Sequence, residues 1–212
     1  MDRKKTLIRA AALALALLVL LPFCGCGNRL KFSKGGLTDT KKGITYRFVS
    51  GCYFPKAISE EVYATFKHGD VSLDYFPIEG LSPEEWLVSE TGDVVYSGGD
   101  RLPDLKEFGA ESMLICYNSE VIISFAEITD PAFISKVIDA YYADAEPKSP
   151  NYDSNTYRLM FSSPKYPALY YMLYLVSYEG GTLLCESGRT GVDAGTLFDD
   201  YIEEYVYPED SQ

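Results

Sequence analysis

Few residues of this chain have the types and spacing that acid–base or nucleophilic chemistry needs. His68 is the only histidine, and it lies beside Asp70 in a short polar stretch between two alternating apolar segments. A Ser-His-Asp relay requires a histidine that packing holds between a nucleophile and an acid. A turn does not hold a side chain in this way, so we interpret His68 as a solvated turn residue.

A second candidate is the alternating oxygen pattern of Asn151, Asp153 and Asn155, which is typical of the start of a calcium-binding loop. Such a loop also needs glycine at its sixth position and glutamate at its twelfth. This chain has Thr156 and Ser162 there. The pattern therefore favours a polar linker, and we predict no metal site.

The carboxylates near the C-terminus form two pairs with i, i+4 spacing, which could hold a cation or serve as acid and base. They are Asp199, Asp200, Glu203 and Glu204. Their positions lie opposite the apolar stripe of an expected helix, where side chains face solvent. No nucleophile elbow or phosphate-binding glycine loop is present either. We predict no catalytic residue and no cofactor.

Tyrosine is the most unusual component, with 18 residues in the chain. Tyr170, Tyr174 and Tyr178 share one face of the expected strand Leu169–Tyr178, because alternate residues of a strand point the same way. A sheet face of tyrosines offers flat apolar area with hydroxyl groups, which suits sugars, peptides and protein surfaces. The alternative is that these rings belong to the core. We predict that this face is the binding site if helices cover only the other face.

The first 25 residues have the pattern of an export signal. Several bases precede a charge-free apolar run from Ala10 to Phe23. As a helix this run would be about 21 Å long, which is short for a hydrocarbon core of about 30 Å and typical of a signal peptide.

Residues 20–27 read Leu-Leu-Pro-Phe-Cys-Gly-Cys-Gly. This stretch resembles the lipobox of bacterial lipoproteins, in which small residues precede a cysteine that receives the lipid and becomes the mature N-terminus. The resemblance implies acylation at Cys26, which follows the small Gly25, with Cys24 as the alternative. It also implies anchoring to the extracytoplasmic face of a cell membrane through that lipid.

Charge divides the rest of the chain into two parts. Residues 26–42 carry five bases against Asp39 alone, whereas the whole chain has a net charge of −12. We interpret residues 26–42 as a flexible basic tether and residues 43–212 as one acidic domain. Nucleic-acid binding needs clustered Lys and Arg, so this domain is not expected to bind nucleic acid.

Apolar periodicity and turn residues predict an α+β fold, an antiparallel sheet with helices packed on one face. The order of elements also allows two βββα units, residues 43–146 and 151–212. The Ile128-Thr129-Asp130 segment between an expected strand and helix is similar to small α+β domains of bacterial lipoproteins. We expect helices after the Ser82 capping box, from Asp130-Pro131, and from about Thr196. Expected strands are Ile44–Val49, Glu61–Lys67, Val71–Phe76, Asp93–Ser97, Glu111–Tyr117, Val121–Ile128, Tyr157–Phe161, Leu169–Tyr178 and Thr182–Glu186.

The cysteines that follow the lipobox are Cys52, Cys116 and Cys185. The last two lie in apolar strand-like runs, so we expect them to be buried small apolar side chains. A Cys116–Cys185 disulfide is the alternative.

These observations favour a membrane-anchored, extracytoplasmic lipoprotein that binds a protein, peptide or glycan without catalysing a reaction. Two alternatives stay open. One is a structural or envelope-assembly component, and the other is a glycan hydrolase that uses two carboxylates about 5 to 10 Å apart.

Overall fold

The computed structural model describes residues 28–33, 35–49, 52–99, 102–149, 154–178, 180–186 and 190–202. The export segment, Cys24 and Cys26 lie outside these residues. So do Asn151, Asp153, Glu203 and Glu204. Among the described residues, no helix is both long enough and apolar enough to cross a bilayer.

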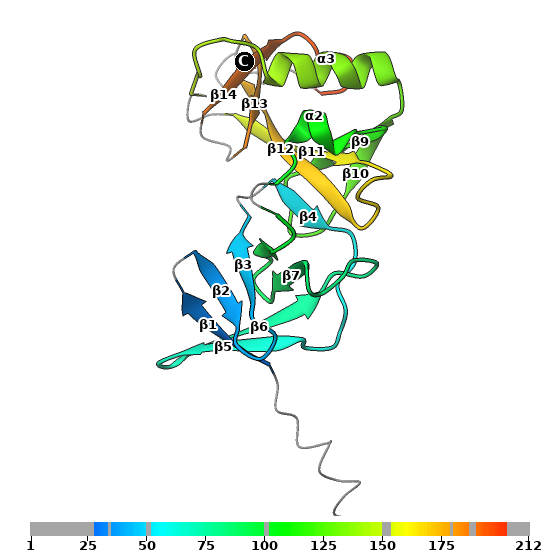
Figure 1. Ribbon diagram of the computed structural model, residues 1–212. Coiled ribbons are helices and arrows are strands. Elements are labelled where there is room, and N and C mark those ends of the chain that lie inside the picture. The colour runs from blue at the N-terminus through cyan, green and yellow to red at the C-terminus, as the bar shows by residue number, and fades with distance from the viewer. Residues whose placement is uncertain are drawn as a thin grey trace, which may run out of the picture.

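The first part of the chain forms a closed, seven-stranded barrel, seen in the lower half of Figure 1. Its strands follow the order β1-β2-β3-β8-β7-β6-β5, and a parallel pairing of β1 with β5 closes it. The strands are β1 (Asn28–Ser33), β2 (Gly36–Asp39), β3 (Ile44–Phe48), β5 (Ala64–His68), β6 (Val71–Pro77), β7 (Trp86–Ser89) and β8 (Val94–Tyr96). Apolar side chains fill the interior, so the barrel is a packed core: Leu30, Leu37, Tyr46, Ala64, Tyr75, Leu87 and Val95.

The second part is an antiparallel sheet in the order β10-β9-β11-β12-β13-β14, in the upper half of Figure 1. The short strand β4 pairs with the first residues of β12, on the edge that β13 occupies farther along. Helix α3 lies across one face (Figure 1), with Ile134 and Val137 buried. The elements are β4 (Tyr53–Pro55), α2 (Leu105–Phe108), β9 (Ser112–Tyr117), β10 (Ser124–Ile128), α3 (Pro131–Tyr141), β11 (Asn155–Ser162), β12 (Leu169–Tyr178), β13 (Gly181–Cys185) and β14 (Gly191–Gly195).

One hydrophobic core joins the barrel to the sheet. Strand β7 is buried on both faces, because Leu87 points into the barrel while Trp86 and Val88 point outward into the core of the sheet. Tyr53 lies at this junction, with its ring centroid 5.6 Å from that of Trp86 and 5.4 Å from that of Tyr171. The barrel and the sheet are therefore packed against each other through aromatic side chains.

The expected α+β fold, with helices packed on a single sheet, is wrong. The described residues are 48% strand and 9% helix, and a closed barrel stands beside the second sheet. Closure of the barrel depends on the parallel β1–β5 pairing, which joins residues far apart in sequence. Local periodicity carries no information on such a contact.

Two of the expected helices do not form in the described chain. After Ser82 there is a single turn, in which Trp86 N–H donates to the Ser82 carbonyl at 2.9 Å, and the chain then extends as β7. Residues 196–202 form successive turns instead of a helix. Trp86 and Leu87 are buried in the first segment, and Phe198 and Ile202 in the second, whereas Tyr201 is exposed. Tertiary packing overrides the helical preference in both places. The expected helix from Asp130-Pro131 is confirmed, with the Asp130 carboxylate accepting from Ala132 N–H.

The expected tether and the expected repeat also need correction. Residues 28–33 and 36–39, which fall in the segment interpreted as a tether, form the barrel strands β1 and β2. Strand pairing does not follow a division into 43–146 and 151–212 either, because β9 of the first segment pairs with β11 of the second along its whole length.

Candidate functional site

The three tyrosines predicted to form a binding face do lie on one face of β12, and each is half-buried. The alternate residues Leu169, Tyr171, Leu173 and Leu175 join the core beneath α2 and α3. Tyr174 and Tyr178 instead pack around Val176, Leu183 and Cys185 on the opposite face. The Lys56 ammonium lies 4.6 Å from the centre of the Tyr170 ring. The three tyrosines therefore share one face of β12, but each ring is partly buried against neighbouring side chains.

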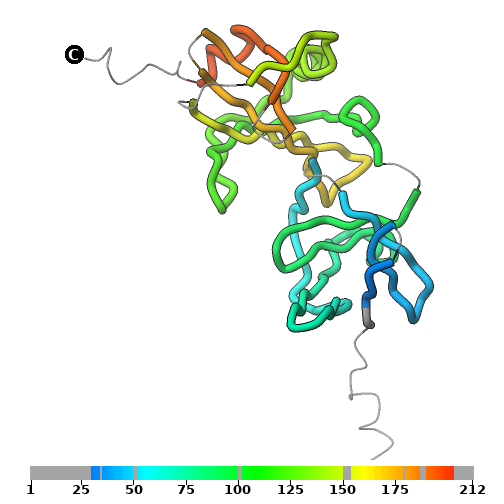
Figure 2. The backbone as a smooth tube through the Cα atoms, turned by 90° about the vertical axis from the view of Figure 1, so that its left-hand side faces the viewer, coloured from blue at the N-terminus to red at the C-terminus, as the bar shows by residue number. Residues whose placement is uncertain are grey.

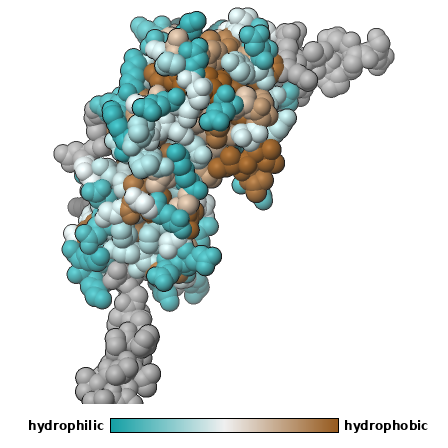
Figure 3. Space-filling model, turned by 90° about the vertical axis from the view of Figure 1, so that its right-hand side faces the viewer, coloured by the Kyte–Doolittle hydropathy of each residue, from teal (hydrophilic) through white to brown (hydrophobic). Residues whose placement is uncertain are grey.

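A more exposed apolar surface lies at the hairpin between β9 and β10, which we call the β9–β10 hairpin (residues 117–125). The loop extends away from the sheet, as the green tube in Figure 2 shows. It forms an apolar knob in the space-filling view of Figure 3. Its large exposed side chains are Tyr117, Val121, Ile122, Ile123 and Phe125.

The expected strand Val121–Ile128 begins three residues later than predicted, at Ser124. Pairing with β9 begins only at Ser124, and the register shifts between Ser124 and Ala126, so that Phe125 is an extra residue in the ladder. A bulge of this kind bends the strand and redirects the side chain at the bulge. Residues 121–123 therefore precede the paired residues of β10, and the Ile123 carbonyl accepts from Tyr117 N–H at 3.0 Å where the loop meets the ladder.

Aromatic packing braces the base of this hairpin. The Phe125 ring lies 4.8 Å from that of Tyr117 and 5.7 Å from that of Tyr157, measured between centroids. Tyr157 in turn packs against the main core. Arg158 Nε donates to Asn118 Oδ1 at 3.0 Å. The apolar tip is thus held by contacts that connect it to the body of the sheet.

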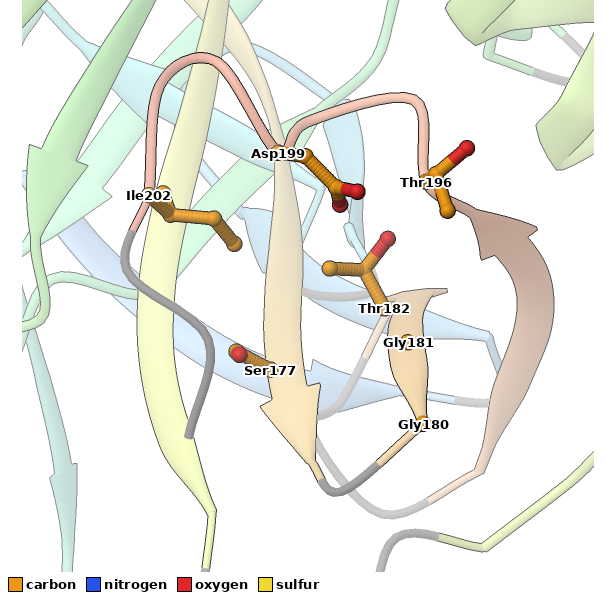
Figure 4. Close-up of a pocket in the computed structure, with 7 residues that line it drawn as sticks. All are labelled: Ser177, Gly180, Gly181, Thr182, Thr196, Asp199 and Ile202. Atoms are coloured by element: carbon orange, nitrogen blue, oxygen red, sulfur yellow. The ribbon is translucent and has the colours of Figure 1, made fainter. Parts of the chain in front are cut away.

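A small pocket lies beside the turn that joins β12 to β13 and is drawn in Figure 4. It has a volume of about 380 Å³ and is formed where the β12–β13 turn meets the turns after β14. Its lining residues are Ser177, Gly180, Gly181, Thr182, Thr196, Asp199 and Ile202. Figure 4 shows the Asp199 carboxylate and the Thr182 hydroxyl turned toward the same space.

The remaining sequence candidates do not converge. His68 is exposed at the end of β5, where its ring stacks on Phe66 at 6.4 Å. Of the four C-terminal carboxylates, the two that the structure describes are exposed, and only Asp199 lines the pocket. Across the described part of the chain, no three His, Cys, Asp or Glu side chains gather in a way that would hold a metal ion.

Cys116 and Cys185 are buried with free thiols, as expected, and Cys52 is buried with a free thiol as well. Burial raises the pKa of each, that of Cys185 to about 11. The register places the two sheet cysteines in one row across four adjacent strands. Cys116 on β9 pairs with Arg158 on β11, Arg158 with Tyr174 on β12, and Tyr174 with Cys185 on β13. Three strand spacings of about 4.8 Å separate the two cysteines, which is far beyond the Cα distance of a disulfide. A Cys116–Cys185 bridge is therefore excluded in this fold.

Comparison with known proteins gives no match of any kind. No protein-family model matches the chain, and neither a curated protein nor a solved structure is similar to it.

Proposed function

We propose that this chain is a lipid-anchored accessory protein of the extracytoplasmic face of a bacterial membrane, and that it binds another protein through the β9–β10 hairpin. The single observation that carries the binding role is the clustering of exposed apolar side chains in that hairpin. Of the exposed large hydrophobic residues, five lie within nine positions, from Tyr117 to Phe125. Clustered exposed apolar side chains mark interaction sites, whereas scattered ones do not.

The hairpin also suits binding energetically. Burying a large apolar side chain contributes about 1.5–3 kcal/mol, and Val121, Ile122 and Ile123 are all available for it. Because the aromatic rings at the base already hold the loop, the loop would lose little conformational freedom on association. Such preorganisation favours affinity.

Charge indicates the chemistry of the partner. Glu120 lies in the loop and Glu127 is exposed on β10, and the chain as a whole is acidic. A complementary surface would carry an apolar groove bordered by Lys or Arg. Two copies of this chain would bring like charges together, so a different protein is the better partner.

The location rests on the sequence. The basic and apolar run of residues 1–25 and the lipobox-like cysteines support export and acylation. Cys26 lies two positions before Asn28, the first residue of β1. Acylation there would hold the barrel close to the membrane, while the hairpin belongs to the second sheet.

The binding role can be tested by placing a photoreactive amino acid at Ile122 of the full chain in the native cell. Val71, exposed in the β5–β6 hairpin, is the matched control position. We expect one crosslinked product of defined mass from Ile122, none from Val71, and loss of the product when Val121→Ser and Ile123→Ser are added. Equal products from both positions, or none from Ile122, would refute the proposal. A product of twice the chain's mass would identify a second copy instead of another protein.

The anchor has a separate test. Cys26→Ser should move the protein from the detergent phase to the aqueous phase in a phase-separation experiment, and Cys24→Ser should not. If neither substitution changes the partition, the chain is not acylated at these cysteines.

A further inference from the structure

We infer that the pocket between the β12–β13 turn and residues 196–202 binds a small primary amine that carries hydroxyl groups, such as an amino sugar. This inference is independent of the proposed docking role, because the pocket and the β9–β10 hairpin share no described residue and involve different strands. The volume of about 380 Å³ falls within the range of small-molecule sites.

The lining groups define the chemistry of the ligand. Among the described residues that line the pocket, Asp199 is the only charged one, and its carboxylate forms no hydrogen bond or ion pair with another described residue. Three residues with hydroxyl groups, Ser177, Thr182 and Thr196, also line the pocket, and the Thr182 hydroxyl is turned toward the Asp199 carboxylate in Figure 4. A carboxylate among neutral hydroxyls favours a ligand with one positive charge and several hydroxyl groups, because charged hydrogen bonds are the stronger ones.

Two of these hydroxyl residues belong to the folded body of the sheet. Ser177 and Thr182 are almost fully buried, and they face each other in the β12–β13 ladder. The Thr182 hydroxyl donates to the Gly195 carbonyl at 3.0 Å, which fixes its orientation and leaves its oxygen free to accept a hydrogen bond. The pocket therefore has acceptors whose positions are set by the strands.

The other walls limit the size and the kind of ligand. The Ile202 side chain points into the pocket in Figure 4 and offers an apolar surface for the carbon face of a ring. Gly180 has a φ of 95°, a conformation that favours glycine, and with Gly181 it adds no side chain to the pocket. A calcium ion is a poorer fit, because it takes six to eight oxygen ligands and the described lining residues include a single carboxylate.

The test uses the full chain purified in detergent, with binding of glucosamine and of glucose followed by saturation-transfer NMR at pH 7. We expect saturable binding of glucosamine and at least about tenfold weaker binding of glucose, since glucose lacks the ammonium group that would pair with Asp199. Asp199→Asn should weaken glucosamine binding about tenfold or more.

Asp200→Asn is the matched control, because it removes the same charge from an exposed neighbour that does not line the pocket. It should change the dissociation constant less than about twofold, since exposed charges outside a site contribute little. Thr196→Val is a second lining variant, and it should also weaken binding. Equal losses in Asp199→Asn and Asp200→Asn would show general charge attraction and overturn the inference. So would the absence of saturable glucosamine binding, or binding of Ca²⁺ without any response to glucosamine.

Discussion

The ring of Phe125 lies against that of Tyr117, with 4.8 Å between their centroids and 45° between their planes. These residues begin and end the β9–β10 hairpin, so their contact fixes the direction in which the loop leaves the sheet. Phe125 takes this position because the register shift makes it an extra residue in β10. The bulge thus converts an ordinary strand connection into a braced apolar projection.

Replacing Phe125 with alanine should therefore destabilise the protein. Aromatic pairs contribute about 0.5–1.5 kcal/mol beyond the area that they bury, and Phe125 is 38% exposed. We expect a loss of about 1–2 kcal/mol, well below the 3–5 kcal/mol typical of a fully buried phenylalanine. Urea denaturation would measure it. Val71→Ala, at an exposed position without such a contact, should stay within about 0.5 kcal/mol, and an equal loss in both variants would contradict the bracing role.

Substitutions at the apolar tip of the β9–β10 hairpin should, in contrast, change the stability of the protein very little. Val121→Ser combined with Ile123→Ser removes mainly exposed apolar surface, since both side chains are about half exposed or more. The free energy of unfolding should change by less than about 1 kcal/mol, and binding of a hydrophobic dye should fall. Thermal denaturation and dye fluorescence would provide the two measurements. A loss of stability above about 2 kcal/mol would mean that the tip packs within the native fold.

The sequence predicted individual strands better than their arrangement. The bounds of Leu169–Tyr178 and the shared face of Tyr170, Tyr174 and Tyr178 followed from alternation alone, because that strand is long and regular. Trp86–Ser89 was misread because a strand buried on both sides shows no alternation. The barrel depends on the β1–β5 pairing, for which no local pattern exists.

Neither the pocket nor the β9–β10 hairpin was predicted as a functional site from the sequence. The pocket was missed because its hydroxyls come from three separate segments, and only Asp199 stood out as a charge. The exposed loop of the β9–β10 hairpin was not recognised because Val121-Ile122-Ile123 has high strand propensity. A run of this kind is normally assigned to the strand that follows it.

Tyr53 should contribute strongly to the free energy of unfolding, because it lies between the barrel and the sheet. Its ring contacts those of Trp86, Phe108 and Tyr171, and its hydroxyl donates to the Pro103 carbonyl at 2.7 Å. Tyr53→Phe keeps the ring and should cost about 0.5–1.5 kcal/mol for the lost hydrogen bond. Tyr53→Ala should cost about 3–5 kcal/mol.

Because one core spans both parts, the native protein should unfold in a single transition in urea, followed by far-ultraviolet circular dichroism and by tryptophan fluorescence. The single tryptophan, Trp86, lies at the junction and reports on it directly. Separate transitions by the two probes in the native chain would show that the barrel and the sheet fold independently, contrary to this expectation.

The buried tyrosines should make the fold sensitive to alkali. Burial raises the pKa of Tyr75 to about 12, with the nearby Asp93 carboxylate adding to the effect, and burial likewise raises the pKa of Tyr46, Tyr53 and Tyr171. A tyrosine in the unfolded chain titrates near pH 10. The folded protein therefore keeps protons that the unfolded chain releases, so this contribution to stability is complete below about pH 10 and is lost as the pH rises toward 12.

Absorbance at 295 nm, recorded together with circular dichroism, would follow both events. We expect the buried tyrosines to ionise only as the fold is lost, so that their absorbance change coincides with the change in circular dichroism. Tyr75→Phe removes one of the raised groups, so its stability should fall less steeply between pH 10 and 12 than that of the native chain. Ionisation of all 18 tyrosines near pH 10 in a folded protein would contradict the burial on which this expectation rests.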